Sequence, residues 1–200
     1  MKYIMFRRRR EKKTDYKQRL ALVKSGKTRI AVRRAARNIR VQFIRSDGTC
    51  DSVVAEFLSK NLSKYGWNYH NASLPAAYLT GYIAGADART KGVGEAIVDT
   101  GLQTSVKSSS IYAAALGAKD AGVVIDIGKE VLPPKDRVSG KHISAFAAKI
   151  KGTPMYQRQF SGYLKKGIDP EKIPEMFEAA KREIALKYNL EMKKEVVING

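Results

Sequence analysis

Regular patterning begins in this chain with two short stretches in which hydrophobic and polar residues alternate. Ile30 and Val32 stand between charged or small neighbours, and residues 39–43 follow the same period of two. This period is typical of strands that bury one face, so we predict a strand around each stretch. Residues 35–38 lie between the two strands and are predicted to connect them.

A turn signal follows the second of these strands. Ser46-Asp47-Gly48 predicts a hairpin, because an Asp-Gly pair readily takes the positive φ angles of a tight turn. Residues 49–55 are then predicted to form a third strand, antiparallel to the second. A short helix is predicted over residues 56–65.

Helical patterns alternate with short apolar runs in the middle of the chain. The predicted order is helix 73–91, strand 96–100, helix 111–121 and strand 123–127. Gly81 and Gly85 lie four residues apart on the first of these helices, which predicts close packing of that face against a sheet or another helix. A hairpin followed by helix, strand, helix and strand predicts an α/β fold, with a mixed sheet flanked by helices.

The start of the chain is basic and has a different pattern. Residues 2–10 are predicted to be an extended basic arm, and residues 14–24 a helix that Gly26 ends. Tyr16 lies at the start of that helix. We interpret residues 1–25 as a basic arm with a first helix, joined to an α/β core domain at 26–130.

The composition changes again after residue 130. Pro133-Pro134 breaks the preceding structure, and the polar sequence beyond predicts helices over 142–150 and 169–188. Prolines confine the start of the last long helix to about residue 174. We interpret 131–200 as a mostly helical C-terminal extension that packs on the core domain or on a partner.

The charge of the chain is strongly one-sided. The 200 residues carry a net charge of +19, while 44% of them are hydrophobic, enough for a folded core. Within residues 1–45 only Glu11 and Asp15 oppose a dense set of lysines and arginines. Such an excess requires counter-ions, and the phosphates of a nucleic acid supply them, so nucleic-acid binding is the first hypothesis.

Metal and cofactor chemistry have little support in the sequence. Cys50 is the only cysteine, which excludes an internal disulfide and a zinc site built from cysteines and fits a reducing cytosol. His70 and His142 have no neighbouring pattern of metal ligands. We therefore expect no metal and no cofactor.

Three other functions are alternatives to RNA binding. A metal-dependent nuclease would need the fold to bring together Asp87, Asp99 and Asp126, which the sequence alone does not place. Membrane binding has only a narrow apolar stripe in the first helix, and no apolar run is long enough to span a bilayer. A general architectural protein, binding DNA or any RNA, remains an open alternative.

RNA suits the basic arm better than sequence-specific DNA, because no zinc finger, leucine zipper or clear helix-turn-helix is present. Arginine forks bind phosphates with two hydrogen bonds and stack on unpaired bases. The aromatic side chains of the arm either stack on bases as well or pack the arm against the body. The candidate RNA-binding residues are Arg7, Arg8, Arg9, Arg10, Lys12, Lys13, Tyr16, Arg19, Arg29, Arg33, Arg34, Arg37 and Arg40.

Several blocks of the sequence resemble a ribosomal protein family. They are Arg7-Arg8-Arg9-Arg10-Glu11-Lys12-Lys13-Thr14-Asp15-Tyr16 with Arg19-Leu20, Arg29-Ile30-Ala31-Val32-Arg33, Leu74-Pro75-Ala76-Ala77-Tyr78-Leu79-Thr80-Gly81, Gly117-Ala118-Lys119-Asp120-Ala121-Gly122 and Arg137-Val138-Ser139-Gly140-Lys141-His142-Ile143. Together they resemble the family of large-subunit ribosomal protein eighteen, in its archaeal and eukaryotic type, whose members bind 5S rRNA. The blocks span about residues 3–145, and the extension matches only in general character.

The resemblance implies a non-enzymatic α/β core with ribonuclease-H-like topology. It also implies that the protein anchors 5S rRNA to the large-subunit rRNA in the central protuberance of the cytoplasmic ribosome. The partners implied are the two RNAs, neighbouring large-subunit proteins and a second 5S rRNA-binding protein, with no membrane. Residues 123–129 depart from the Ile-Pro-His expected in many relatives, which leaves the role of that stretch undefined.

Overall fold

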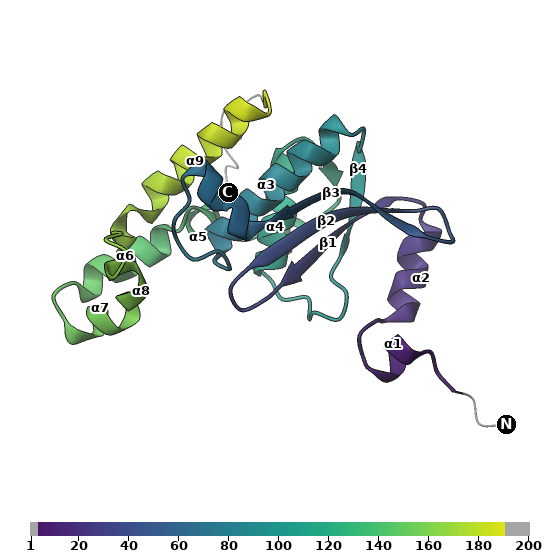
Figure 1. Ribbon diagram of the computed structural model, residues 1–200, viewed down its shortest axis with the longest axis horizontal. Helices are drawn as coiled ribbons and strands as arrows, with labels where there is room; N and C mark the ends of the chain where they lie inside the picture. The colour runs from purple at the N-terminus through teal and green to yellow at the C-terminus, as the bar shows by residue number, and fades with distance from the viewer. Residues whose placement is uncertain (1–3, 191–200) are drawn as a thin grey trace.

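A five-stranded sheet forms the centre of the computed structural model, which describes residues 4–190 (Figure 1). The strands are β1 (Thr28–Arg34), β2 (Ile39–Ser46), β3 (Asp51–Leu58), β4 (Glu95–Asp99) and β5 (Val124–Ile125), in the spatial order β3-β2-β1-β4-β5. β2 is antiparallel to β1 and β3, whereas β4 is parallel to β1, and β5 to β4. The predicted α/β fold with a mixed sheet flanked by helices is confirmed.

The hairpin between β2 and β3 forms where the turn signal predicts it. The carboxylate of Asp47 accepts the backbone N–H groups of Thr49, at 3.1 Å, and Cys50, at 2.7 Å. Gly48 takes a φ of 95°, which an L side chain rarely adopts. Side-chain and backbone chemistry therefore agree on this turn.

The helix predicted over residues 56–65 is wrong in its first part. Residues 56–58 continue β3, and only then does the 3₁₀ helix η1 (Ser59–Tyr65) begin. Pairing with β2 explains the difference: Gln42 lies opposite Glu56 in the ladder and donates to its carboxylate at 2.5 Å. The hydroxyl of Ser59 then accepts the N–H of Ile39 at 2.8 Å, which ties the end of β3 to the start of β2.

Two helices, α3 (Leu74–Thr90) and α4 (Ser110–Asp120), cover one face of the sheet, as predicted. Alternate side chains of β1 and β2, such as Val32 and Phe43, are fully buried against alanines of both helices. In Figure 1 the two helices lie on the far side of the strands from the viewer. The small residues on these helices set how close the layers come.

Glycines allow α3 and α4 to touch through their backbones. A Cβ added at Gly81 would lie 1.9 Å from the carbonyl oxygen of Ala114, and one at Gly117 would lie 2.1 Å from that of Tyr78. Gly85 is similarly close to α4, at 2.7 Å from the Cα of Ala118. The low-relief face predicted from Gly81 and Gly85 is thus confirmed as a helix–helix contact.

The C-terminal extension adds a second hydrophobic core on the outer side of α3. After η2 (Lys129–Val131) it contains α5 (Lys135–Ser139), α6 (Lys141–Ile150), α7 (Pro154–Gln159), α8 (Ser161–Leu164), η3 (Pro170–Lys172) and α9 (Ile173–Lys187). Ile173, Phe177 and Ile184 of α9 are buried with Tyr78 and Leu79 of α3. The long last helix is confirmed, and the extension packs on the core.

The arm predicted to be extended over residues 2–10 is wrong for its second half. Residues 7–10 form a single helical turn, α1 (Arg7–Arg10), and residues 1–3 lie outside the described part. The N–H groups of Arg9 and Arg10 donate to the carbonyl of Phe6, and the Arg8 Nε donates to the Thr14 hydroxyl at 2.8 Å. Arginine has a good helix propensity, so these local bonds prevail over the charge repulsion. The helix predicted over 14–24 is confirmed as α2 (Tyr16–Lys24).

The contact between α3 and α4 gives a first test. We expect Gly117→Ala to lower the free energy of unfolding by at least about 2 kcal/mol, because the new methyl group must push two backbones apart. For a chain of this size such a loss corresponds to a fall in Tm of roughly 4 °C or more. Gly94→Ala is the matched control, since a Cβ there meets nothing within 4 Å. Equal thermal unfolding curves for the two variants would contradict the close packing.

Candidate nucleic-acid interface

The basic N-terminal segment precedes helix α2 and is joined to the body through it. Asp15 caps it, and its carboxylate accepts the N–H groups of Lys17, at 2.9 Å, and Gln18, at 3.1 Å. No residue of α2 is buried. The attachment of this helix to the body therefore depends heavily on polar contacts.

Asp51, the first residue of β3, joins α2 to the sheet. Its carboxylate lies 3.0 Å from the Arg19 guanidinium of α2 and 2.8 Å from the Arg29 guanidinium of β1. The Arg29 side chain is only 4% exposed. One carboxylate thus bridges a helix and a buried strand residue. It holds α2 at the end of the sheet where the β2–β3 hairpin turns.

Asp99, the last residue of β4, continues this charge network. Its carboxylate lies 3.5 Å from Arg29 and 3.3 Å from Arg33, and Arg33 also donates to the Asp99 carbonyl at 3.1 Å. One residue further on, the Thr100 hydroxyl accepts the side-chain N–H of Gln18 at 3.3 Å. Three arginines and two aspartates alternate across α2, β1, β3 and β4, so each buried charge has an opposite neighbour.

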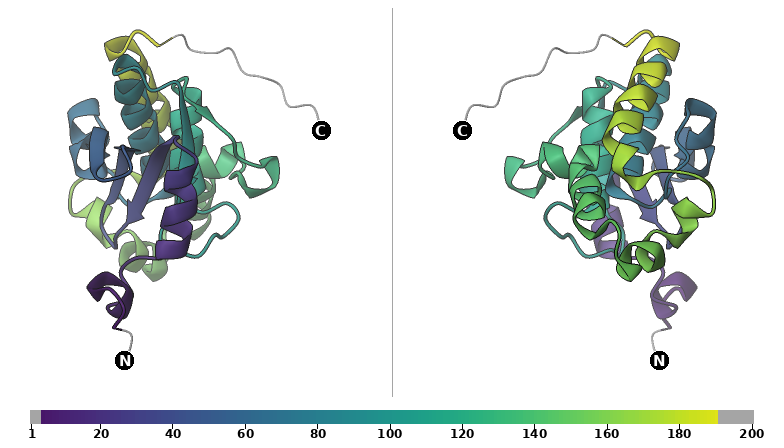
Figure 2. Two further views of the ribbon diagram at one scale, coloured as in Figure 1. Left: turned by 90° about the vertical axis from the view of Figure 1, so that its right-hand side faces the viewer. Right: turned by 90° about the vertical axis from the view of Figure 1, so that its left-hand side faces the viewer.

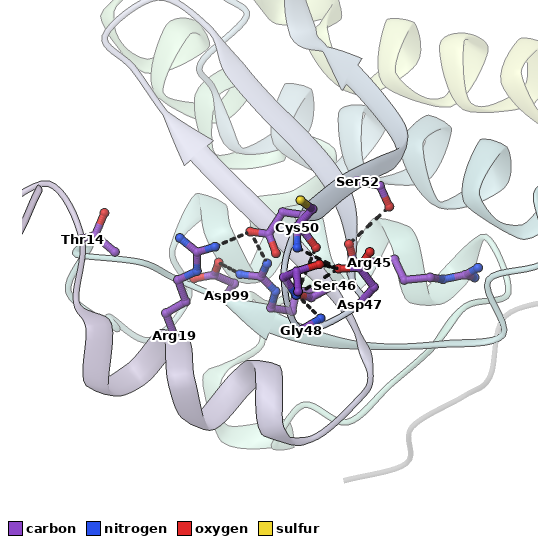
Figure 3. A network of polar contacts seen from close by, with 12 residues as sticks. Thr14, Arg19, Arg45, Ser46, Asp47, Gly48, Cys50, Ser52 and Asp99 are labelled. Atoms are coloured by element: carbon purple, nitrogen blue, oxygen red, sulfur yellow. Dashed lines mark hydrogen bonds and ion pairs between the residues drawn. The ribbon is translucent and has the colours of Figure 1, made fainter.

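Figure 3 shows this network from close by, with Arg19 projecting from α2 toward the sheet. A polar cavity of about 180 Å³ lies between α2 and the sheet, and its lining includes Arg8 and Lys13 beside the paired arginines. The volume is large enough for several water molecules. The space under α2 is therefore polar, with cations at its edge.

The pKa of Asp51 follows from its position in the network. Burial works to raise this pKa, but the nearby guanidinium groups of Arg29 and Arg19 and the polar side chain of Ser46 outweigh it. The pKa therefore lies below its ordinary value of 3.8. The folded arrangement favours the ionised carboxylate, which is the form that holds both guanidinium groups.

The predicted RNA-binding residues fall into two groups. The exposed residues are Arg7, Arg8, Arg9, Arg10, Lys12, Lys13, Arg33, Arg34, Arg37 and Arg40, and of these Arg33 is also held by Asp99. Arg29 differs from all of these, because it is 3% exposed and held by two carboxylates. Arg19 is half-buried and paired, and Tyr16 is half-buried with its ring 5.5 Å from that of Phe6.

Few acids neutralise the exposed group. Glu11 lies 3.8 Å from Arg7 and 2.8 Å from Lys13, and Glu56 lies 3.4 Å from Arg40. Among residues 4–190, no carboxylate lies within ion-pair distance of Arg9, Arg10, Lys12, Arg34 or Arg37. The segment from α1 to β2 is therefore a surface of largely unbalanced positive charge.

The acids of the nuclease hypothesis do not meet. Asp87 pairs with Lys91 at 2.8 Å, and Asp99 is enclosed by arginines. Within the described part of the chain, no three His, Cys, Asp or Glu side chains are grouped so that they could share a metal ion. This geometry gives no support to a carboxylate cluster.

Comparison with known proteins decides which family carries this surface. Residues 2–96 match the model of the family described as ribosomal large subunit proteins 60S L5 and 50S L18. The large ribosomal subunit protein uL18 of Korarchaeum cryptofilum is 50% identical over 93% of this chain and 95% of its own length. The uL18 of Thermofilum pendens is 44% identical, over 90% of this chain and 93% of its own length. The chain belongs to the uL18 family.

Membership of the uL18 family confirms the resemblance seen in the sequence blocks. The uL18 proteins are structural components of the large ribosomal subunit, so this chain is not an enzyme. Over residues 4–190, none of the helices has the length and apolar character needed to cross a bilayer. The alignment with the Korarchaeum uL18 covers so much of the chain that it includes most of the helical extension.

The sequence patterns do not reveal the two aspartates that position the basic segment of this uL18 chain. They place Asp51 in a strand, and Asp99 only as a candidate catalytic acid near the end of a strand. A usable signal existed: Arg29 and Arg33 lie four residues apart on β1, hence on one face, and an aspartate ends the neighbouring strand β4. That pattern can be recognised only when the strand order is known.

The lowered pKa of Asp51 predicts how α2 responds to pH. Because the folded-state pKa is depressed, the stabilisation is present above the ordinary pKa of 3.8 and is lost as pH falls through the lower folded value. We expect α2 to stay docked at neutral pH and to become open to an acid-tolerant protease below about pH 4.

Asp51→Asn should remove this pH dependence of α2 and expose the helix to the same protease at neutral pH. Glu130→Gln is the control, because that carboxylate is 86% exposed and pairs with Lys107, not with a residue of α2. Identical cleavage of wild type and Asp51→Asn over the whole pH range would show that Asp51 does not hold the helix.

Proposed function

We propose that this uL18 protein binds 5S rRNA and anchors it to the large-subunit rRNA in the central protuberance of the cytoplasmic ribosome. Its protein neighbours there would be other large-subunit proteins, including a second 5S rRNA-binding protein. The observation that carries the RNA-binding part is the unbalanced cationic segment held on the body by Asp51. The 5S specificity is taken from the family resemblance.

The exposed cations are assigned to the phosphates of the RNA. Four consecutive arginines in α1 repel one another, and phosphates placed between them would remove that repulsion. Lys12 and Lys13 follow between α1 and α2. Arg33 and Arg34 end β1, Arg37 lies in the β1–β2 connection and Arg40 lies on β2, and these arginines are assigned to RNA phosphates as well. Guanidinium forks bind phosphate oxygens in pairs, which orients the RNA as well as attracting it.

Arg19, Arg29 and Tyr16 have different roles in this proposal. Arg29 is buried, so it acts as a positioning residue that holds Asp51 and Asp99, and Arg19 connects α2 to the same carboxylate. Tyr16 lies against Phe6 and is half-exposed, which leaves an edge of the aromatic pair for a base or ribose. The folded body thus sets the direction in which the cations point.

A salt-titrated binding assay tests the arm. The arm variant is the full chain with Arg8→Gln, Arg9→Gln and Arg10→Gln. Its affinity for 5S rRNA should fall about tenfold or more, and the slope of log K against log salt should decrease by about 2 to 3, since each phosphate contact contributes roughly 0.7 to 0.9. Transfer RNA and a DNA duplex of similar length are the competitors.

A surface control separates this effect from general charge. It carries Lys60→Gln, Lys64→Gln and Lys119→Gln, which remove the same charge from exposed positions outside the basic segment. Wild type and the surface control should both prefer 5S rRNA to the competitors. If the arm variant and the surface control have the same slope, the arm is not the binding element, and equal affinity of wild type for all three nucleic acids would favour the architectural alternative.

The anchoring role of Asp51 gives a prediction opposite to simple electrostatics. Removing a negative charge normally strengthens binding to a polyanion, and Glu130→Gln should bind 5S rRNA as tightly as wild type or slightly more tightly. Asp51→Asn should instead bind about 3- to 10-fold more weakly, because only the fraction of molecules with α2 docked presents the cations correctly. Tighter binding by Asp51→Asn would refute the anchor.

A further inference from the structure

The helical extension contains a second segment without acids. From residue 137 to residue 168 there is no aspartate or glutamate. The cations in it are Arg137, Lys141, Lys149, Lys151, Arg158, Lys165 and Lys166. Its helices α6, α7 and α8 are called here the helical lobe. The lobe and α1 lie toward opposite ends of the long axis of the molecule (Figure 1). Figure 2 looks along that axis from both ends, with the N-terminal helices in front in one view and the lobe in front in the other.

The helical lobe is a folded unit with its own small core. Ala147, Ile150 and Phe160 are buried together, with Tyr156 and Tyr163 packed around them. The Phe160 ring lies 5.4 Å from the Tyr156 ring and 6.1 Å from the Tyr163 ring. This core fixes which side chains of the three helices point outward.

Two sets of contacts hold the helical lobe against the body. Tyr163 accepts the N–H of His70 at 3.2 Å, and its ring lies 5.4 Å from that of Tyr69. On α6, the Ser144 hydroxyl donates to the Glu171 carbonyl at 2.8 Å. The cations of the lobe are therefore presented by a fixed surface.

Most of these cations lack acid partners. Lys141 pairs with Asp136 at 3.4 Å and Lys151 with Glu171 at 2.8 Å, and these two acids flank the acid-free segment. Within residues 4–190, none of the remaining cations has a carboxylate at ion-pair distance; they are Arg137, Lys149, Arg158, Lys165 and Lys166. The lobe is therefore short of counter-ions, as the segment from α1 to β2 is.

Exposed apolar side chains lie among these cations. Phe146 is 41% exposed and Met155 58%, and each is followed one helical turn later by a cation, Lys149 and Arg158 respectively. Leu164 is also 41% exposed and directly precedes Lys165. The centres of protein–protein interfaces are depleted of charge, whereas cations next to exposed aromatic surface are typical of RNA contacts.

We propose that the helical lobe is a second RNA-binding surface, separate from the basic N-terminal segment. Lys149, Arg158 and Lys165 bind backbone phosphates, and Phe146 stacks on an unpaired base or a ribose beside them. The inference rests on the proposed function only in taking RNA as the polyanion. Because α1 lies far from the lobe, the two surfaces contact different segments of RNA.

The test uses the full chain and two labelled probes, 5S rRNA and large-subunit rRNA. The lobe variant carries Lys149→Gln, Arg158→Gln and Lys165→Gln, and it is compared with the arm variant and the surface control. For at least one probe the lobe variant should lower the salt slope by about 2 relative to the surface control. Phe146→Ala should weaken binding of the same probe with the slope unchanged, since stacking releases few counter-ions.

The outcomes separate this inference from the function proposed above. A lobe variant with the salt slope of the surface control for both probes would overturn the second surface, whatever the arm variant does. If the arm variant alone loses no affinity while the lobe variant does, the N-terminal assignment fails and the second surface stands. If Phe146→Ala leaves both RNA affinities unchanged but abolishes binding of a purified large-subunit protein, the lobe is a protein-docking surface and the inference is wrong.

Discussion

The buried guanidinium of Arg29 is the group on which the functional half of this molecule depends. It lies between the carboxylates of Asp51 and Asp99, and through Asp51 it determines where Arg19 and α2 are held. An arginine with so little exposure needs carboxylates beside it, and removing either one would leave Arg29 with a single carboxylate that it shares with another arginine. Arg29, a candidate RNA-binding residue in the sequence, is therefore an internal support for the exposed cations that are proposed to bind RNA.

This arrangement explains why two aspartates are needed to position the cations of a strongly positive protein. Asp51 ends the hairpin turn and Asp99 ends a parallel strand, so the sheet fixes the position of both. They orient arginines by ion pairing from one side, and phosphates are proposed to meet the outer cations from the other. Acidic residues within a basic surface can thus hold its cations in position.

Much of the architecture could be predicted because it follows from local pattern. Alternation identified β1 and β2, Asp47-Gly48 identified the turn, and glycine spacing identified the tight contact between α3 and α4. The role of Arg29 could not be predicted, because it depends on β4 pairing with β1 across many intervening residues. The single turn of α1 depends instead on local contacts. A few hydrogen bonds within residues 6–14 stabilise it despite the repulsion among its arginines. The cationic character of the interface was visible in the sequence, whereas its support was visible only in three dimensions.

Because α2 has no buried residues, the motion of this helix is separate from the opening of the hydrophobic core. A helix that docks through ion pairs can leave the body without opening the hydrophobic core, which is closed by α3 and α4. Undocking would expose the half-buried Leu22 and Val23 of α2 and leave the main core closed. The helix can therefore move separately from the rest of the fold, which a helix that contributed buried side chains to the core could not do.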